Sequence, residues 1–188
     1  MPNWCDNTLT IEGDCEGAKF LMAAFRNEDP FQAIYPCPKE LDHPDAHRFG
    51  GTPEEKANQI VKRRELNDKY GYESGYDWRC GEWGTKWDVD ADIMNEGNAG
   101  LPYMEVCFAS AWSPPIELYR YINRVYPSVR LSWTYEEPGV GFAGDGGCEG
   151  DLFEDNVRDF LYDEEDVNCA PDSYVGSATI LPLPGGAK

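Results

Sequence analysis

The sequence has few basic residues. It contains 16 Lys and Arg against 35 Asp and Glu, which gives a formal net charge of −19 at pH 7. Because phosphate contacts require a surplus of Lys and Arg, this balance argues against direct binding of nucleic acid or of an anionic membrane surface. No apolar run reaches the about 18 residues of a membrane span. The N-terminus shows no signal-peptide pattern, so we expect a cytoplasmic protein.

Metal-binding and thiol chemistry have little support in the sequence. The seven cysteines form no C-x-x-C pair and their number is odd, which argues against a disulfide framework and for a reducing compartment. The two histidines, His43 and His47, are four residues apart and flank Pro44. They form either a metal site with a nearby aspartate or a solvated loop, and the absence of a second ligand cluster favours the loop.

Catalytic signatures are also missing. No P-loop, G-x-S-x-G or H-E-x-x-H motif occurs, and the Gly-rich segment 139–147 has the composition of a turn or bulge. The run of Asp88, Asp90 and Asp92 resembles the start of a calcium loop, but Ile93 and Ala99 occupy the positions of the required Gly and Glu. This run is either a solvated or partner-facing strand or a weak cation site. We predict no catalytic residue, no metal, no cofactor and no enzymatic activity.

Hydrophobic periodicity predicts an α+β fold. The 188 residues suit one domain. Strands are expected at 4–11, 86–93, 101–109 and 129–135, and helices from Glu16 with Asp14 as the cap, at 53–70, and from Pro115 to Val125. A capping box of Thr52 and Glu55 starts the second helix, and Gly71 ends it. Residues 31–35 appear extended by composition, and 36–52 and 71–85 are expected to be loops.

The resulting order is strand, helix, insertion, two strands, helix, strand. This is the split βαβ, or ferredoxin-like, order, with an antiparallel sheet and both helices on one face. We therefore predict a ferredoxin-like domain at 1–145 with an insertion at about 28–85, followed by an acidic C-terminal extension at 146–188 that packs on the same domain. Within that extension, the apolar residues 178–183 are expected to return as an edge strand.

The C-terminal third concentrates the negative charge. Residues 135–172 contain thirteen Asp and Glu, opposed only by Arg158. The spacing of Phe153, Val157, Phe160 and Leu161 predicts an amphipathic helix with an acidic outer face. This charge serves either solubility or the binding of a basic partner. The candidate partner-binding residues are Asp151, Glu154, Asp155, Asp159, Asp163, Glu164, Glu165 and Asp166.

A second candidate surface contains tryptophan. Trp87 is expected in the core, whereas Trp83 and Trp112 lie at the ends of predicted elements. With Lys86 they form either a shallow ligand or interface pocket or hydrophobic caps on the sheet.

Five separated motifs resemble a known family. They are 2–7 (PNWCDN), 31–41 with its IYPCPKEL ending, 83–88 (WGTKWD), 111–115 (AWSPP), and Tyr126-Pro127 through 142–144 (FAG). In this order they resemble the YubB-type ferredoxin-like family of phage, prophage and conjugative-plasmid proteins, over about residues 1–145. The resemblance implies the same fold and a mobile-element origin, and it implies no catalytic residue.

These observations lead to a functional hypothesis. The first candidate is a non-enzymatic accessory protein, a monomer or homodimer in the host cytoplasm. It would bind a host protein that has a basic nucleic-acid-binding surface and so act as an anti-defence inhibitor that mimics DNA. The alternative is a small-ligand or nucleotide-binding module at the Trp83, Lys86 and Trp112 end of the sheet. A virion-associated structural protein is a third candidate, which the net charge disfavours because it opposes self-assembly.

Overall fold

The sheet has the strand order of a ferredoxin-like domain, extended at one edge. The computed structural model describes residues 3–42, 51–97, 100–161 and 179–180. The strands are β1 (Trp4–Glu12), β2 (Ala91–Gly97), β3 (Tyr103–Ala111), β4 (Arg130–Glu137), β5 (Phe142–Glu149), β6 (Leu152–Leu161) and β7 (Thr179–Ile180). They form one sheet in the order β2-β3-β1-β4-β5-β6-β7, and every neighbouring pair is antiparallel. The first four strands of this order are the predicted ferredoxin-like core.

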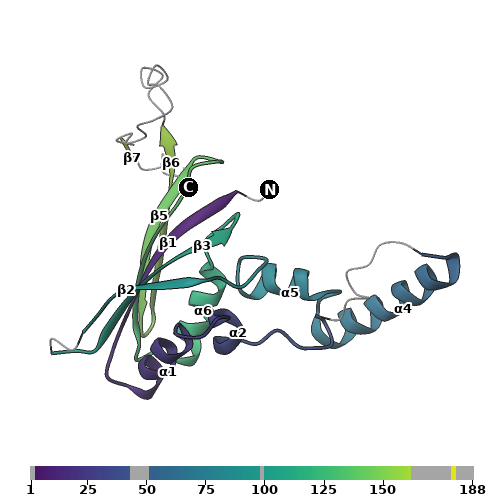
Figure 1. The fold of residues 1–188 in the computed structure, drawn as a ribbon, viewed down its shortest axis with the longest axis horizontal. Coiled ribbons are helices and arrows are strands. Elements are labelled where there is room, and N and C mark those ends of the chain that lie inside the picture. The colour runs from purple at the N-terminus through teal and green to yellow at the C-terminus, as the bar shows by residue number, and fades with distance from the viewer. Residues whose placement is uncertain (1–2, 43–50, 98–99, 162–178, 181–188) are drawn as a thin grey trace.

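Helices cover one face of the sheet. The helices are α1 (Glu16–Ala24), α2 (Pro30–Ile34), α4 (Pro53–Tyr70), α5 (Gly75–Glu82) and α6 (Ile116–Val125). In Figure 1, α1, α2 and α6 lie on the same side of the sheet, and none of the described helices covers the other side. Apolar side chains of α1 and α6, such as Leu21 and Leu118, are fully buried against inward-facing residues such as Leu9 and Val106. Both predicted helices and their common face are confirmed.

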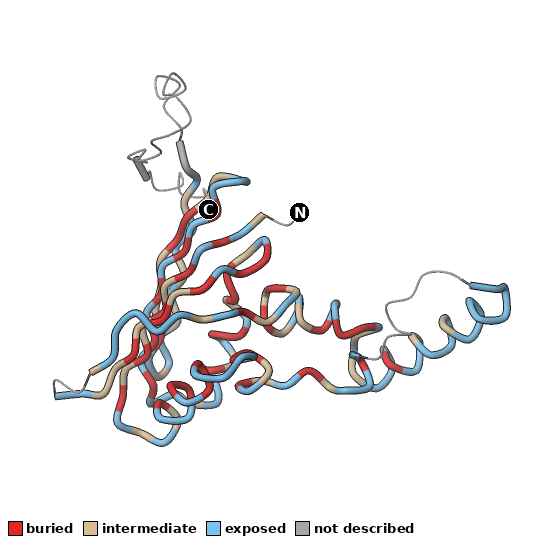
Figure 2. Tube along the Cα trace, in the orientation of Figure 1, coloured by how far each residue is buried: buried red, intermediate tan, exposed pale blue. Residues whose placement is uncertain are grey.

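The helix of the insertion extends away from this body (Figure 1). The predicted capping box is present, because Thr52 Oγ1 accepts from the backbone N–H of Glu55 and the Glu55 side chain accepts from the N–H of Thr52. Gly71 ends α4 in the left-handed conformation, as expected. Leu66 is the one buried residue that this helix contributes, and Figure 2 shows most of its length as exposed. No described helix is both long and apolar enough to cross a membrane.

Several local predictions in and around the insertion are wrong. Residues 30–34 form α2 rather than an extended segment, and 75–82 form α5 rather than a loop. The structural reason for α2 lies in Asp88, whose carboxylate accepts hydrogen bonds from the backbone N–H groups of Phe31 (2.9 Å) and Gln32 (2.7 Å). Asp88 is thus a helix-capping group from a distant part of the chain. The cap of α1 also differs, because Cys15 Sγ rather than Asp14 accepts from Ala18 N–H.

The second strand along the chain begins later than predicted. β2 starts at Ala91, and residues 86–90 are outside it. Trp87, which was expected in the core, is 44% exposed, and a bulge between Ile93 and Asn95 breaks the alternation further along. The core position of a tryptophan in this stretch belongs instead to Trp83, which is 1% exposed.

The chain after residue 137 continues the sheet instead of leaving it. The Gly-rich segment forms β5, and 152–161 form β6 rather than the predicted amphipathic helix, so the predicted boundary at 145/146 falls inside β5. Glycine is required in β5 because aromatic rings of β4 occupy the space of its side chains. A Cβ at Gly144 or Gly146 would meet the rings of Tyr135 or Trp133 at less than 3.0 Å. The predicted C-terminal edge strand is present as β7, two residues long.

Candidate functional site

The uncovered face of the sheet is polar, and the strand alternation explains which residues it carries. In β1 the side chains of Cys5, Asn7 and Leu9 are buried under the helices, whereas Asp6 and Thr8 point to the opposite face. Antiparallel sheets commonly leave one face to solvent in this way. The functional question is therefore which chemistry the uncovered face presents.

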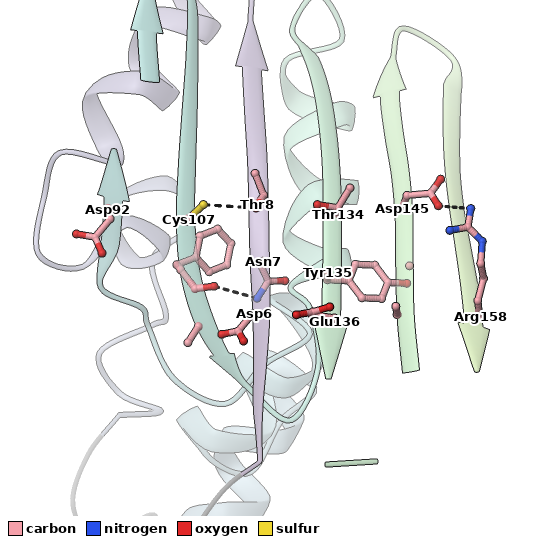
Figure 3. Close-up of a pocket in the computed structure, with 14 residues that line it drawn as sticks. Asp6, Asn7, Thr8, Asp92, Cys107, Thr134, Tyr135, Glu136, Asp145 and Arg158 are labelled. Atoms are coloured by element: carbon pink, nitrogen blue, oxygen red, sulfur yellow. Dashed lines mark hydrogen bonds and ion pairs between the residues drawn. The ribbon is translucent and has the colours of Figure 1, made fainter. Parts of the chain in front are cut away.

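A shallow depression of about 560 Å³ lies on this face and is lined by residues of six strands, from β2 at one side to β6 at the other. Figure 3 shows it from the uncovered side, with Asp6 and Glu136 on the two central strands, Asp92 toward the β2 edge, and Asp145 and Arg158 toward the β6 edge. Its floor contains the Thr8 hydroxyl, which lies 3.4 Å from the Cys107 thiol on the neighbouring strand.

Carboxylates predominate around this depression. We use the term acidic face for the Asp and Glu side chains that the register places on the uncovered side. They are Asp6, Glu12, Asp92, Glu105, Glu136, Asp145, Glu149 and Glu154.

Two arginines neutralise only part of the acidic face. Arg158 forms an ion pair with Asp145, and Arg130 lies 3.5 Å from Glu12. Asp6 and Glu136 are directly opposite each other across the β1–β4 pair, and both are exposed. Like charges at such positions destabilise a sheet. Because no ion pair reaches either residue within the described parts of the chain, this repulsion is not relieved inside the protein.

The predicted acidic surface of the C-terminal segment is only partly assembled. Asp151, Glu154 and Asp159 are exposed on or beside β6. Glu154 is on the acidic face, whereas the register places Asp159 on the helix-covered side. Asp163, Glu164, Glu165 and Asp166 lie outside the described residues.

Asp155 has a structural role that the sequence did not indicate. Its carboxylate accepts hydrogen bonds from the indole N–H of Trp133 (3.1 Å) and from the hydroxyl of Tyr135 (3.2 Å). Burial, followed by the negative charge of Asp155, raises the pKa of Tyr135 well above its usual value. The Asp155 side chain is therefore hydrogen-bonded to Trp133 and Tyr135 on the helix-covered side of the sheet, and it is not a free surface charge.

The structure also rearranges the predicted tryptophan pocket. Trp83 is buried, and its indole N–H donates to the carbonyl oxygen of Tyr35 at 2.9 Å. Lys86 Nζ instead lies 4.3 Å from the ring centre of Trp87 and 5.4 Å from that of Trp112. The exposed aromatic neighbours of Lys86 are thus Trp87 and Trp112.

The described residues offer little for metal or thiol chemistry. Within them, no group of three or more His, Cys, Asp or Glu side chains is placed to hold a metal ion, and His43 and His47 lie outside them. Burial raises the pKa of the Cys5 thiol to about 12 and that of Cys148 to about 11, so both are poor nucleophiles at neutral pH. Burial also raises the pKa of the Asp88 carboxyl.

The candidate residues predicted from the sequence did not include the two central members of the acidic face. Asp6 and Glu136 each lie on the polar side of an alternating strand, which was the available signal. Their juxtaposition depends on the pairing of β1 with β4, two strands far apart in the sequence. The charge concentration at 151–166 drew attention away from these isolated carboxylates.

A family model supports the fold. Residues 82–172 match a family model described as a ferredoxin-like domain in Api92-like protein. The crystal structure of a protein api92 from Yersinia pseudotuberculosis is similar over 87% of this chain and 99% of that chain, with 12% sequence identity and a TM-score of 0.48. No curated protein matches the chain. The predicted ferredoxin-like α+β fold is confirmed, whereas the YubB-type assignment and the mobile-element origin stay predictions.

Proposed function

We propose that the protein acts without catalysis, by binding a basic protein surface through its acidic face. The observation that carries this proposal is the uncompensated pair of Asp6 and Glu136 on an uncovered sheet face. A partner that supplies a cation between them removes their mutual repulsion and gains charge-assisted hydrogen bonds. The high net negative charge of the chain adds long-range attraction to a basic partner.

The partner class in this proposal is a host protein that binds nucleic acid. Such proteins carry the surplus of Lys and Arg that contacts phosphates, and a sheet of carboxylates presents the same sign of charge as a phosphate backbone. Occupying that surface excludes the nucleic acid, which is the action of a DNA-mimicking inhibitor. The resemblance to proteins of mobile elements is the reason for placing the inhibitor among anti-defence functions.

The test compares a face variant with a matched control. Asp6→Asn, Asp92→Asn and Glu136→Gln together remove three exposed charges from the acidic face. The control variant removes three exposed charges elsewhere on the chain, through Glu28→Gln, Asp68→Asn and Glu73→Gln. Proteins retained from a bacterial lysate by the tagged wild type are identified, purified and titrated against all three proteins by calorimetry.

We expect the affinity to fall with rising salt, because dissolved ions screen the attraction between the carboxylates and a basic partner. We expect the affinity of the face variant to be lower by about 10-fold or more, because three of the carboxylates that complement the partner's positive charge are neutral in it. The control variant is expected to bind like the wild type, and nucleic acid is expected to compete with the protein. Equal binding by the face and control variants, or binding that is insensitive to salt, contradicts the proposal.

A further inference from the structure

Three of the six tryptophans gather in an exposed patch. We define the tryptophan patch as Trp4, Trp87 and Trp112, which are 49%, 44% and 46% exposed. The ring centres of Trp4 and Trp87 are 6.2 Å apart, and Lys86 links the rings of Trp87 and Trp112. Indole rings are large and mostly apolar, and grouped exposure of this kind marks interaction surfaces in soluble proteins.

The backbone imposes this exposure. Trp112 has a φ of 74°, a left-handed conformation that is unusual for a bulky residue. Its N–H donates to the carbonyl oxygen of Asn3 at 3.0 Å. On either side, the hydroxyl of Thr85 donates to the carbonyl of Ala111 at 3.0 Å, and that of Ser113 donates to the carbonyl of Gly84 at 2.6 Å. These bonds hold the two segments that carry Trp87 and Trp112 together.

The tryptophan patch is continuous with the acidic face. Trp4 and Asp6 are two residues apart in β1 and therefore point to the same side of the sheet. Their partners on β3 are the small residues Ala111 and Ala109. Glu136 is opposite Asp6 on the other neighbouring strand. Aromatic rings and unpaired carboxylates thus occupy adjoining positions.

We propose that the tryptophan patch and the neighbouring carboxylates together bind arginine side chains of a basic protein partner. The inference rests on the proposed function and specifies the chemistry that the partner must present. A guanidinium group is planar and weakly hydrated, so it stacks on an indole while donating two hydrogen bonds to a carboxylate; an ammonium group does this less well. Lys86 Nζ lies within cation–π range of Trp87 and Trp112, which shows that both rings are positioned to take part in cation–π contacts.

The experiment compares two peptides of equal length and charge, oligo-arginine and oligo-lysine. Dissociation constants are measured by calorimetry for the wild type, for Trp4→Ala and for Trp87→Ala. Phe20→Ala serves as a control, because Phe20 is a 40% exposed aromatic residue on α1, on the opposite side of the sheet. Far-UV circular dichroism and binding of oligo-lysine report whether each variant remains folded.

We expect the wild type to bind oligo-arginine about 5-fold or more tightly than oligo-lysine. The two tryptophan variants are expected to lose most of this preference while their affinity for oligo-lysine stays unchanged, and Phe20→Ala is expected to keep the preference. These results support stacking as the source of the selectivity.

Three other outcomes overturn the inference in different ways. Equal binding of both peptides to the wild type, with both lost in the variant of Asp6, Asp92 and Glu136, refutes the role of the tryptophan patch and leaves the acidic-face function intact. Binding of neither peptide refutes both. Binding of ATP or of a single-stranded oligothymidine that disappears in Trp87→Ala assigns the patch to base stacking instead, with Lys86 as the phosphate contact.

Discussion

Replacing Asp155 with Ala is expected to destabilise the sheet rather than to weaken a binding surface. The carboxylate accepts hydrogen bonds from the Trp133 indole and the Tyr135 hydroxyl, and both donor residues are at most 5% exposed. A hydrogen bond to a charged group contributes about 1.5–3 kcal/mol to stability. Because Asp155 itself is half-buried, the low end of that range applies to each bond. Two such bonds give a loss of about 3 kcal/mol in the free energy of unfolding.

Urea unfolding followed by tryptophan fluorescence measures this loss. With a urea dependence of about 1–3 kcal/mol per molar, the midpoint is expected to fall by about 1–3 M. Asp155→Asn keeps one acceptor oxygen without the charge, so we expect it to fall between the wild type and Asp155→Ala. Asp159→Ala is the matched control, since Asp159 is exposed on the same strand, and its stability is expected to stay within about 0.5 kcal/mol of the wild type. If Asp155→Ala and Asp159→Ala unfold at the same urea concentration, the assignment of Asp155 as a structural acceptor is refuted.

Two further predictions concern the core of the sheet and the insertion. Gly146→Ala is expected to cost more than about 3 kcal/mol in urea unfolding, because its Cβ would lie 2.3 Å from the carbonyl oxygen of Glu154, a backbone atom that cannot rotate away. Stability is expected to fall as the pH rises from about 10, the pKa of tyrosine in an unfolded chain, toward 12. Burial raises the pKa of Tyr35 to about 12, and a hydrogen bond to Glu82 raises that of Tyr72 to about 12, so the folded state retains protons that the unfolded state loses.

Each of these predictions has a control. For the glycine, Gly147→Ala places its Cβ 3.0 Å from the nearest atom, so a much smaller loss is expected, and equal losses in the two variants contradict the steric argument. For the pH effect, Tyr72→Phe removes one of the tyrosines whose pKa is raised in the folded state and is expected to flatten the decline in urea midpoint between about pH 10 and 12. A decline of the same slope in that variant shows that Tyr72 does not cause it.

The sequence was sufficient to predict those features that depend on residues close together in the chain. The capping box of Thr52 and Glu55 and the left-handed Gly71 depend on residues a few positions apart, and all are as predicted. The first strand and the two core helices followed equally from their periodicity. The fold class then came from the order of these elements, because few topologies accommodate that order.

The failures have a common physical cause, which is contact between distant segments. Phe153 and Val157 are four residues apart, a spacing that puts them on one side of either a helix or a strand, and pairing with β5 decides for the strand. The glycines of β5 are typical of a turn when the sequence is read alone. Their actual role is to leave space for the aromatic rings of β4, which the sequence does not show. Asp88 resembles one member of an alternating strand, although its partners, Phe31 and Gln32, are more than fifty residues away.

The candidate site shows the same division. Prediction from the sequence concentrated the negative charge at 151–166, where Glu154 is the described candidate that lies on the acidic face, and it pointed to Lys86 and Trp112, which lie close together. It chose Trp83 instead of Trp87 as the surface ring, because nothing local distinguishes two tryptophans at the ends of the motif at 83–87. The opposition of Asp6 and Glu136 requires the strand register, which no local pattern specifies.

The projecting helix α4 is held less firmly than the rest of the molecule, so the two parts differ in local stability. Packing holds the sheet and its covering helices together, but 53–70 contribute one buried side chain, Leu66, and depend mainly on their end caps. Such a helix opens on its own, at a small fraction of the free energy needed to unfold the body, so its amide protons exchange with solvent long before those of β1. Its outward residues are therefore free to change over evolution provided that the caps remain, and the arm is the part of this chain where length and sequence can drift without cost to the sheet.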